Sequence, residues 1–258
     1  MYWVEDFYSR TGQWWGRAEA RLTDRDHHRV SLLHDHCGGA PKRVLELGAG
    51  YGATAVATAQ AGHMVTAIEI SDRIDFVDGL ARDVSPGALG VIKDDFYTVR
   101  LDRPFDVVCY WNGFGVGSDA DQRRLLERIA TEWLRPGGAA LIDVSNPFVW
   151  ARWNGGEEHL MPAPERGYDH ELHERTTFDP VSCVAVDTWW EASSPHQSIS
   201  QFLRCYTPAD LMLLLAGTGL QLTAITVGDR TFTPTPQPGL AELLHEHHEY
   251  LAVLRHNG

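Results

Sequence analysis

The sequence predicts an α/β fold built on a mostly parallel, doubly wound sheet with helices on both faces. Between residues 43 and 144, short apolar runs that favour strands alternate with helical patterns. The first of these runs passes into a helix through three glycines on alternate positions, Gly48, Gly50 and Gly52. After residue 148 the alternation stops and shorter strand-like runs follow. We therefore expect a seven-stranded sheet, an antiparallel β insertion and an N-terminal helical lid.

The N-terminal segment, residues 1–40, is rich in aromatic side chains at its start and in charged side chains later. Its apolar spacing predicts one or two helices, and Gly38-Gly39 followed by Pro41 ends the last of them. We interpret this segment as a helical lid.

The core is predicted to comprise residues 41–148 and 205–258. Strands alternating with helices imply parallel pairing through right-handed crossovers. The expected strands of the parallel part are 43–47, 64–69, 89–93, 105–110 and 138–144, with helices near 52–61, 72–84 and 119–134. After a helix that begins at Thr207-Pro208, strands at 220–227 and 250–255 complete the sheet.

The insertion is predicted to span residues 149–204. Three runs in and beside it have strand character, at 171–179, 182–191 and 197–205. We expect an antiparallel sheet that covers the binding site of the second substrate. Its exposed strand edges need cover, which favours a homodimer.

Composition excludes several classes of partner. The formal net charge is −13 and the only basic clusters are short pairs such as Arg123-Arg124, which argues against a nucleic acid. No apolar run approaches about 18 residues, so we expect no membrane contact. The N-terminus lacks the features of a signal peptide, and the four cysteines are scattered, so we expect a reduced, cytoplasmic protein.

The glycine-rich turn predicts a nucleotide-type ligand. Glycines let backbone N–H groups approach a ligand without an intervening side chain. The next strand ends at Glu69, about 20 residues later, where a carboxylate at a strand tip is placed to bind a ribose. The first half of the chain is thus predicted to bind an adenosine-like cofactor.

The spacing of these residues identifies the cofactor more closely. Gly48-x-Gly50-x-Gly52, with Glu46 two residues before it, resembles the first motif of class I S-adenosylmethionine-dependent methyltransferases, which have a Rossmann-like fold. The resemblance continues, in order, through Glu69, Asp94-Asp95-Phe96, the run 105–108 and the run 134–138. It implies transfer of a methyl group from S-adenosylmethionine to N or O of a small organic molecule. The β insertion looks like the small-molecule branch of that family.

The resemblance also implies roles for individual residues. Glu46, Gly48, Ala49 and Gly50 would border the amino-acid end of the cofactor. Glu69, with Ile70 beside it, would bind the ribose hydroxyls. Asp95 would face the adenine amino group with Phe96 beside the ring, and Asp94 could take that part instead. Tyr110 and Asn112 would lie near the sulfonium as cofactor-binding and catalytic candidates.

Large aromatic side chains are the candidates for the acceptor pocket. Indole and phenol rings suit a flat apolar acceptor or a cationic amine. The candidates are Tyr8, Trp14, Trp15, Trp111, Trp150 and Trp189. Because neighbouring residues of a strand face opposite sides, at most one tryptophan of each adjacent pair should line a pocket.

Histidines offer a general base but no metal site. His173 is the candidate base, with His159 and His170 nearby in sequence; each could instead be a surface or core histidine. The stretches His34-x-His36-Cys37 and His245-x-His247-His248 lack a remote partner at zinc-ligand spacing, so no metal is expected.

Three other functions remain open from the sequence alone. An enzyme of the same fold could use the sulfonium for cyclisation or alkyl transfer, because fold does not fix reaction. The glycine turn alone is also compatible with an oxidoreductase. A non-catalytic protein that binds the cofactor is the third.

Overall fold

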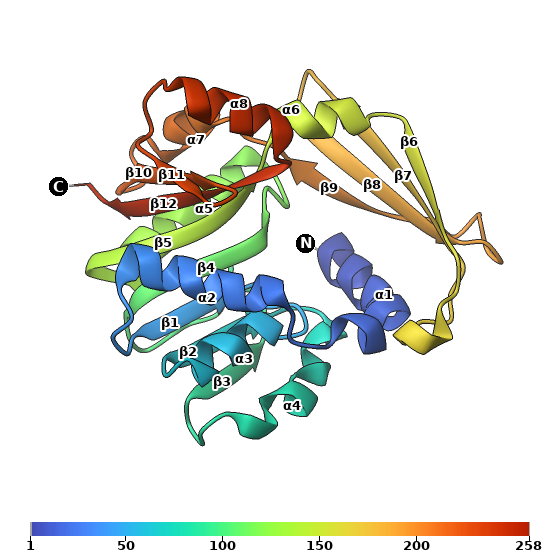
Figure 1. Ribbon diagram of the computed structural model, residues 1–258, viewed down its shortest axis with the longest axis horizontal. Helices are drawn as coiled ribbons and strands as arrows, with labels where there is room; N and C mark the ends of the chain where they lie inside the picture. Colours follow the sequence, from blue (N-terminus) through green and yellow to red (C-terminus); the bar gives the residue numbers. More distant parts are fainter. Residues whose placement is uncertain (1, 258) are drawn as a thin grey trace.

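The computed structural model describes residues 2–257, in which a central sheet and a second, antiparallel sheet are joined by helices (Figure 1). Met1 and Gly258, the outer ends of the predicted segments 1–40 and 205–258, lie outside the described residues. None of the described helices is long and apolar enough to cross a membrane.

The central sheet confirms the predicted α/β class but has eight strands in the described chain, in the order β11-β10-β12-β5-β4-β1-β2-β3. Its strands are β1 (Arg43–Leu47), β2 (Met64–Glu69), β3 (Leu89–Lys93), β4 (Phe105–Phe114), β5 (Leu134–Ser145), β10 (Leu220–Val227), β11 (Arg230–Phe232) and β12 (Glu249–His256). Strands β1 to β5 pair in parallel, whereas β12, β10 and β11 extend the sheet by antiparallel pairing.

The prediction of seven strands was wrong because β11 is short. It has three residues and returns from β10 through a tight turn at Gly228, whose φ of 56° lies in the left-handed region. A strand this short gives no readable alternation in the sequence.

Most of the helices begin near the residues predicted from the sequence, whereas two of the predicted helices are interrupted or end differently. They are α1 (Tyr2–Glu19), α2 (Asp24–Cys37), α3 (Ala53–Gln60), α4 (Val77–Leu80), α5 (Asp119–Arg128), α6 (Pro147–Trp150), α7 (Pro208–Leu215) and α8 (Pro238–Glu246). Ser118 and Thr207 cap α5 and α7 by reciprocal hydrogen bonds with an aspartate three residues later.

The predicted helix 72–84 is broken into the 3-10 turn η1 (Asp72–Phe76), α4 and η2 (Ala81–Asp83). Gly79 in its middle weakens a continuous helix. The predicted helix 119–134 ends in a π-helical turn at Ile129–Trp133, and β5 begins at Leu134, before the start of the predicted strand 138–144.

Apolar residues on the two faces of the central sheet form two cores. On one face, Leu125 and Leu126 of α5 pack with α7 and α8 against side chains such as Leu47 and Val108. On the other face, Leu33 of α2 and residues of α3 pack against Val44, Val107 and their neighbours. Burial of both faces explains why these strands appear in the sequence as continuous apolar runs.

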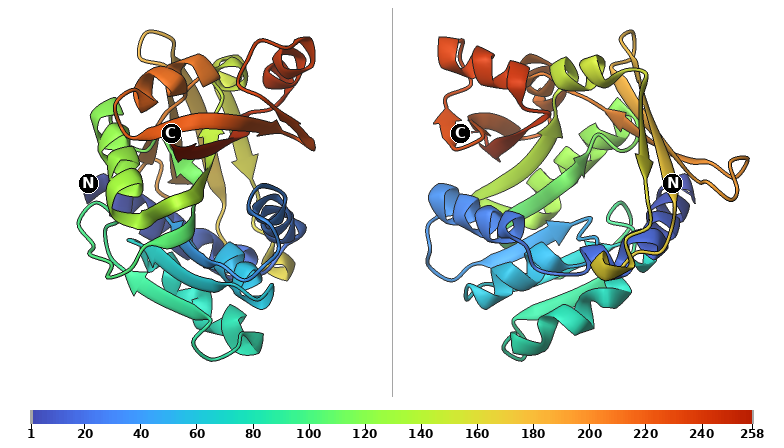
Figure 2. Two further views of the ribbon diagram at one scale, coloured as in Figure 1. Left: turned by 90° about the vertical axis from the view of Figure 1, so that its left-hand side faces the viewer. Right: turned by 45° about the vertical axis from the view of Figure 1, so that its right-hand side comes forward.

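The second sheet consists of β6 (Gly156–Leu160), β7 (Leu172–Asp179), β8 (Val184–Glu191) and β9 (Ile199–Arg204), all antiparallel in that order. β6 was not predicted, because its exposed Glu157 and Glu158 give no apolar signal. The inner face of this sheet packs on α1, where Phe7 and Trp14 are buried with Leu172 and Ile199. Helix α1 therefore packs on the side of the second sheet that faces the central sheet (Figure 1), and Figure 2 shows the two sheets from other sides.

Candidate active site

A cavity of about 550 Å³ lies beyond the carboxyl ends of β1, β2 and β4. The strand order reverses between β1 and β4, and ligands of doubly wound sheets bind at such a point. The volume falls in the range of pockets that hold a cofactor or a small molecule. Besides these strand ends, α1, α2, η1 and the segment between β6 and β7 contribute lining residues.

The glycine turn, residues 48–52, forms the floor of the cavity. Gly48, Gly50 and Gly52 have φ values of 59°, 57° and 78°, all in the left-handed region. A Cβ at Gly48 would lie 3.0 Å from the ring of Tyr110, and one at Gly52 would lie 2.6 Å from Val77, whereas Gly50 faces open space. The turn thus leaves bare backbone toward the cavity, and Gly48, Ala49 and Gly50 all line it.

Glu69 ties the end of β2 to this turn. It is 5% exposed; its Oε2 accepts the Gly50 N–H and its Oε1 accepts the Ser71 N–H, each at 2.8 Å. Each carboxylate oxygen retains further acceptor capacity for a ligand hydroxyl. Glu69 and Ile70 both line the cavity.

The structure distinguishes the two aspartates that follow β3. Asp95 lines the cavity together with Phe96, and its Oδ1 accepts the Tyr97 N–H at 2.8 Å. Asp94 is exposed, lies outside the cavity lining and accepts the Asp95 N–H at 2.7 Å. Of the two, only Asp95 is placed to contact a ligand.

The end of β4 brings Tyr110, Trp111 and Asn112 to the cavity wall. Asn112 has a φ of 55° and lies where the register between β4 and β5 shifts. Its backbone N–H donates to the Asp143 carboxylate, and the residue lines the cavity. Asparagine tolerates this conformation better than most residues. Burial raises the pKa of Tyr110 well above its usual value, so that its hydroxyl stays protonated.

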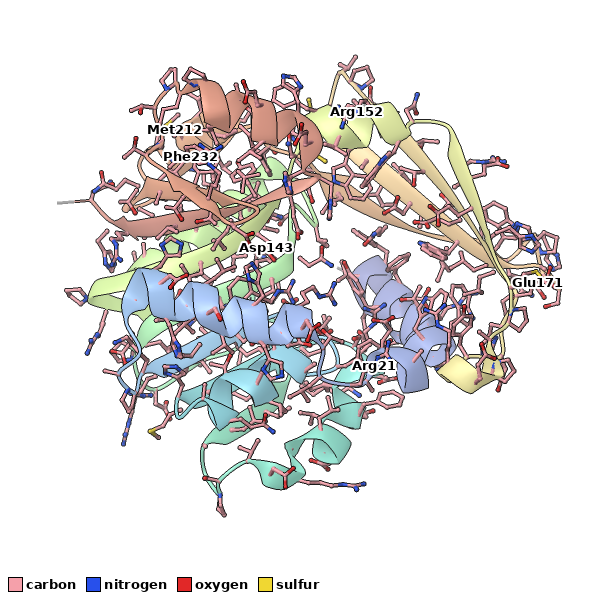
Figure 3. All side chains as sticks on the ribbon, in the orientation of Figure 1. Arg21, Asp143, Arg152, Glu171, Met212 and Phe232 are labelled. Atoms are coloured by element: carbon pink, nitrogen blue, oxygen red, sulfur yellow. The ribbon has the colours of Figure 1, made fainter. Side chains whose placement is uncertain are left out.

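A buried ion pair joins α2 to the sheet under the cavity. The Arg29 guanidinium donates to the Asp143 carboxylate at 3.1 Å and to Thr54 Oγ1 at 3.2 Å, and it lies 5.2 Å from the centre of the Trp111 ring. Burial raises the pKa of Asp143 to about 7, and Arg29 acts in the opposite direction. Figure 3 shows Asp143 beside α2.

Arg29 lines the cavity but is not among the site residues predicted from the sequence. A signal was present: Arg29 falls on the buried stripe of α2, between Asp26 and Leu33, where an unpaired charge is costly.

Glu46 lies beneath the glycine turn, outside the cavity lining. It is 2% exposed and its Oε2 has no hydrogen-bond partner among the described residues. Burial raises its pKa to about 8. The carboxyl therefore holds its proton at neutral pH.

The far side of the cavity is aromatic. Tyr8 and Trp15 of α1 face Tyr168, which follows β6, and the rings of Trp15 and Tyr168 meet edge to face at 5.0 Å. The Tyr8 hydroxyl donates to Gln201 of β9 at 3.2 Å, and burial raises its pKa to about 12.

Arg73 of η1 fastens α1 over the cavity. Its Nε donates to the Tyr8 carbonyl at 3.0 Å and its guanidinium packs 5.0 Å from the Tyr8 ring centre.

Four other predicted site residues lie outside the cavity lining. Trp14 is one helical position from Trp15 and is buried against Phe7 and Leu172 instead. Trp150 packs on Trp153, Trp189 packs behind Trp15, and His173 stacks on Trp190. The described lining residues include no histidine, lysine or cysteine.

The doubly wound sheet, the glycine turn and the acids at the ends of β2 and β3 define a class I methyltransferase. The chain belongs to this methyltransferase family: residues 15–225 match its methyltransferase domain. It is 33% identical over 201 residues to the cypemycin N-terminal methyltransferase of a Streptomyces species, a match that covers 76% of this chain and 79% of that protein.

Solved structures share the fold. The CcbJ methyltransferase from Streptomyces caelestis aligns with a TM-score of 0.70 and 20% identity over 92% of this chain and 91% of its own. An S-adenosylmethionine-dependent methyltransferase from Clostridium acetobutylicum aligns with a TM-score of 0.69 and 10% identity over 99% of this chain and 100% of its own.

The chain is accordingly an S-adenosylmethionine-dependent methyltransferase. This confirms the family, the cofactor and the reaction class predicted from the ordered motifs.

Proposed function

We propose that the acceptor atom is an amine nitrogen, carried by a small peptide or a peptide-like metabolite. The observation that carries this proposal is the cavity wall around Asn112, which is aromatic and, among the described lining residues, holds no histidine, lysine or cysteine. A hydroxyl acceptor needs a base to remove its proton during the reaction, whereas an amine needs only to be unprotonated. The relative named above acts on the N-terminus of cypemycin.

Two of the carboxylates that line the cavity, Asp26 and Glu69, are already engaged in hydrogen bonds. Asp26 accepts hydrogen bonds from Thr23 and Thr54, which lower its pKa against the effect of burial. Glu69 is engaged with the Gly50 and Ser71 amides. Neither is free to take a proton from a bound acceptor.

S-adenosylmethionine, when bound, supplies an activated methyl group on its sulfonium. We assign Glu69 to the ribose hydroxyls, Asp95 to the adenine amino group and Phe96 to the adenine ring. Gly48, Ala49 and Gly50 would support the amino-acid end, and Ile70 would pack beside the ribose. Arg29 is placed to pair with the cofactor carboxylate, because it lines the same cavity with a positive charge.

The acceptor would lie between Trp111 and the aromatic wall of Tyr8, Trp15 and Tyr168. Ring faces attract a protonated amine before it loses its proton to water. The Asn112 side chain would accept a hydrogen bond from the remaining amine N–H and so direct the nitrogen lone pair. Fixing the nucleophile near the methyl group supplies a large part of the rate acceleration. Trp14, Trp150, Trp189 and His173 have no part in this assignment.

Three broader features complete the proposal. Residues 1–40 act as the lid, 41–148 and 205–258 as the cofactor-binding core, and 149–204 as the acceptor cover. The exposed edges of the second sheet favour a homodimer, and the acidic chain favours no nucleic acid partner. Four free cysteines suit a reducing, cytoplasmic setting.

The test is a matched panel of acceptors. Short peptides with a free N-terminus, the same peptides after N-acetylation, and hydroxyl analogues of the N-terminal residue are each incubated with enzyme and S-adenosylmethionine. We expect S-adenosylhomocysteine and a methylated product only with the free amines. Turnover of the hydroxyl analogues alone would contradict the amine assignment, and methylthioadenosine as product would contradict methyl transfer.

A further inference from the structure

The outer face of the second sheet carries a row of nitrogen and oxygen ligands that the methyl transfer does not use. Leu160, Leu172 and Trp189 point toward α1 in the packed cluster on the inner face. Successive side chains of a strand alternate between faces, so their neighbours His159, His173 and Trp190 point outward. The strand register places these three side by side across β6, β7 and β8.

The geometry of this row brings three donor atoms together. The rings of His159 and His173 stack with centres 4.3 Å apart and planes 6° apart, and His173 stacks in turn on Trp190 at 5.4 Å. His159 Nε2 lies 2.7 Å from Glu171 Oε1. One ligand atom from each of His159, Glu171 and His173 lies within 4.8 Å of the other two.

We propose that His159, Glu171 and His173 bind one zinc ion. Two imidazole nitrogens and a carboxylate oxygen form a donor set that zinc accepts, with water as the fourth ligand. Tetrahedral bonds of about 2.0–2.1 Å place donor atoms about 3.3 Å apart. The side chains of His159 and Glu171 are 47% and 42% exposed, so rotation about their side-chain bonds can bring the donors to that spacing.

The neighbouring charges leave this site available. Arg175, in the next row of the same face, is paired with Glu157 at 2.6 Å, and His170 is paired with Glu191 at 2.7 Å. Zinc would insert between His159 Nε2 and Glu171 Oε1, and the single proton of the neutral imidazole would then lie on Nδ1.

The position of the ligands gives the ion a structural role. His159 and Glu171 stand at the two ends of the segment 160–170, which leaves β6 and returns to β7. Leu160, Arg166 and Tyr168 of this segment line the cavity. A zinc ion bound to His159 and Glu171 would hold the two ends of the segment 160–170 together and reduce the motion of the part of the cavity wall that this segment forms. Figure 3 shows Glu171 at the far edge of the second sheet, well away from Asp143 in the core.

Zinc titration tests the site without any acceptor. The full chain, free of purification tags and treated with chelator, is titrated with zinc by calorimetry, and with cobalt to record the visible absorption of a tetrahedral site. We expect one ion per chain and at least a tenfold loss of affinity in His159→Gln, His173→Gln and Glu171→Gln. His170→Gln and His34→Gln, which alter histidines outside the cluster, should bind zinc as the unmodified chain does.

Hydrogen exchange tests the role of the ion. Zinc should slow amide exchange in the segment 160–170 of the unmodified chain but not of His173→Gln, while the central sheet exchanges equally in both. Absence of stoichiometric zinc, unchanged affinity in His173→Gln, or one ion for two chains would overturn the site. Zinc binding without slower exchange would overturn the role in the acceptor wall. S-adenosylmethionine binding to each variant in chelator checks that it is folded, and none of these outcomes depends on the amine proposal.

Discussion

The two walls of the cavity are built by different means. The wall that we assign to the cofactor, the cofactor wall, comes from the ends of parallel strands buried on both faces. Its key contacts use main-chain groups, such as the Gly50 and Ser71 amides that hold Glu69. The wall that we assign to the acceptor, the acceptor wall, comes from α1 and the segment after β6, and it consists of side chains such as Trp15 and Tyr168.

The two walls should tolerate different substitutions. A wall made of backbone is fixed by the fold, so substitutions there act on cofactor binding or on stability. A wall made of side chains on a helix and a connecting segment can be altered residue by residue while the sheet stays intact. Substitutions in the two walls should therefore separate cofactor affinity from acceptor affinity.

The largest effect is expected where α2 meets the central sheet. Asp143→Ala leaves Arg29 buried beneath the cavity without its acidic partner, which should lower the free energy of unfolding by about 3–5 kcal/mol. Urea unfolding at pH 8 measures it. Glu242→Ala, at an exposed position of α8, serves as the control and should stay within about 0.5 kcal/mol. Equal stability of the two variants would show that α2 is only loosely joined to the sheet.

Glu69→Ala should specifically damage the cofactor wall. Loss of a charge-assisted acceptor is expected to weaken S-adenosylmethionine binding by about 2–3 kcal/mol, or roughly 30- to 150-fold in Kd. Calorimetric titration measures it, with Glu69→Gln expected to fall between because its amide oxygen can still accept one N–H. An unchanged Kd would remove Glu69 from the binding site.

Glu46→Gln should change how stability depends on pH. The folded pKa of Glu46 is about 8, above the usual value of 4.5 that applies to the unfolded chain. Between these values the unfolded chain binds fewer protons than the folded one, so this group lowers stability as pH rises.

Removing the group should flatten that slope by roughly 1.4 kcal/mol per pH unit. Urea unfolding at pH 6 and pH 7 measures the difference between the unmodified chain and the variant. Asp143, whose pKa is also raised, is present in both proteins and cancels in the comparison. Parallel pH profiles would mean that the Glu46 carboxyl is ionised in the folded protein.

The smallest effect is expected on the acceptor wall. Tyr8→Phe removes the hydrogen bond from α1 to Gln201 of β9, worth about 0.5–1.5 kcal/mol. The KM for an accepted amine should rise by about two- to tenfold, while the Kd of S-adenosylmethionine changes less than twofold. Steady-state kinetics and calorimetry report the two quantities separately. A larger change in cofactor Kd than in acceptor KM would show that α1 belongs to the cofactor wall.

The same contrast explains what could be predicted from the sequence. Parallel strands buried on both faces appear as apolar runs, and a turn that only glycine can form is visible as three spaced glycines. The strands and the cofactor motifs were therefore readable in order, down to Glu69 at the tip of β2. The sequence does not show whether Asp94 or Asp95 faces the cavity. The two carboxylates are neighbours, and the conformation of the turn after β3 decides which of them points inward.

The features outside the strand motifs were less predictable because they depend on contacts between distant segments. Arg29 meets Asp143 across 114 positions, and the edge strand β6 is charged and exposed. Trp14 and Trp15 are adjacent in sequence, yet only the packing of α1 against Leu172 decides that Trp14 turns inward to the second sheet. Local patterns can mark a residue as buried, but they do not show which distant segment it meets.

The place of α1 has a consequence for engineering. This helix stands at the start of the chain, but it packs on the sheet β6 to β9, which follows more than a hundred residues later. A chimera that receives only the inserted strands of a relative would inherit a mismatched partner helix. To transplant acceptor choice between relatives, residues 2–19 and 156–204 should be exchanged as one unit.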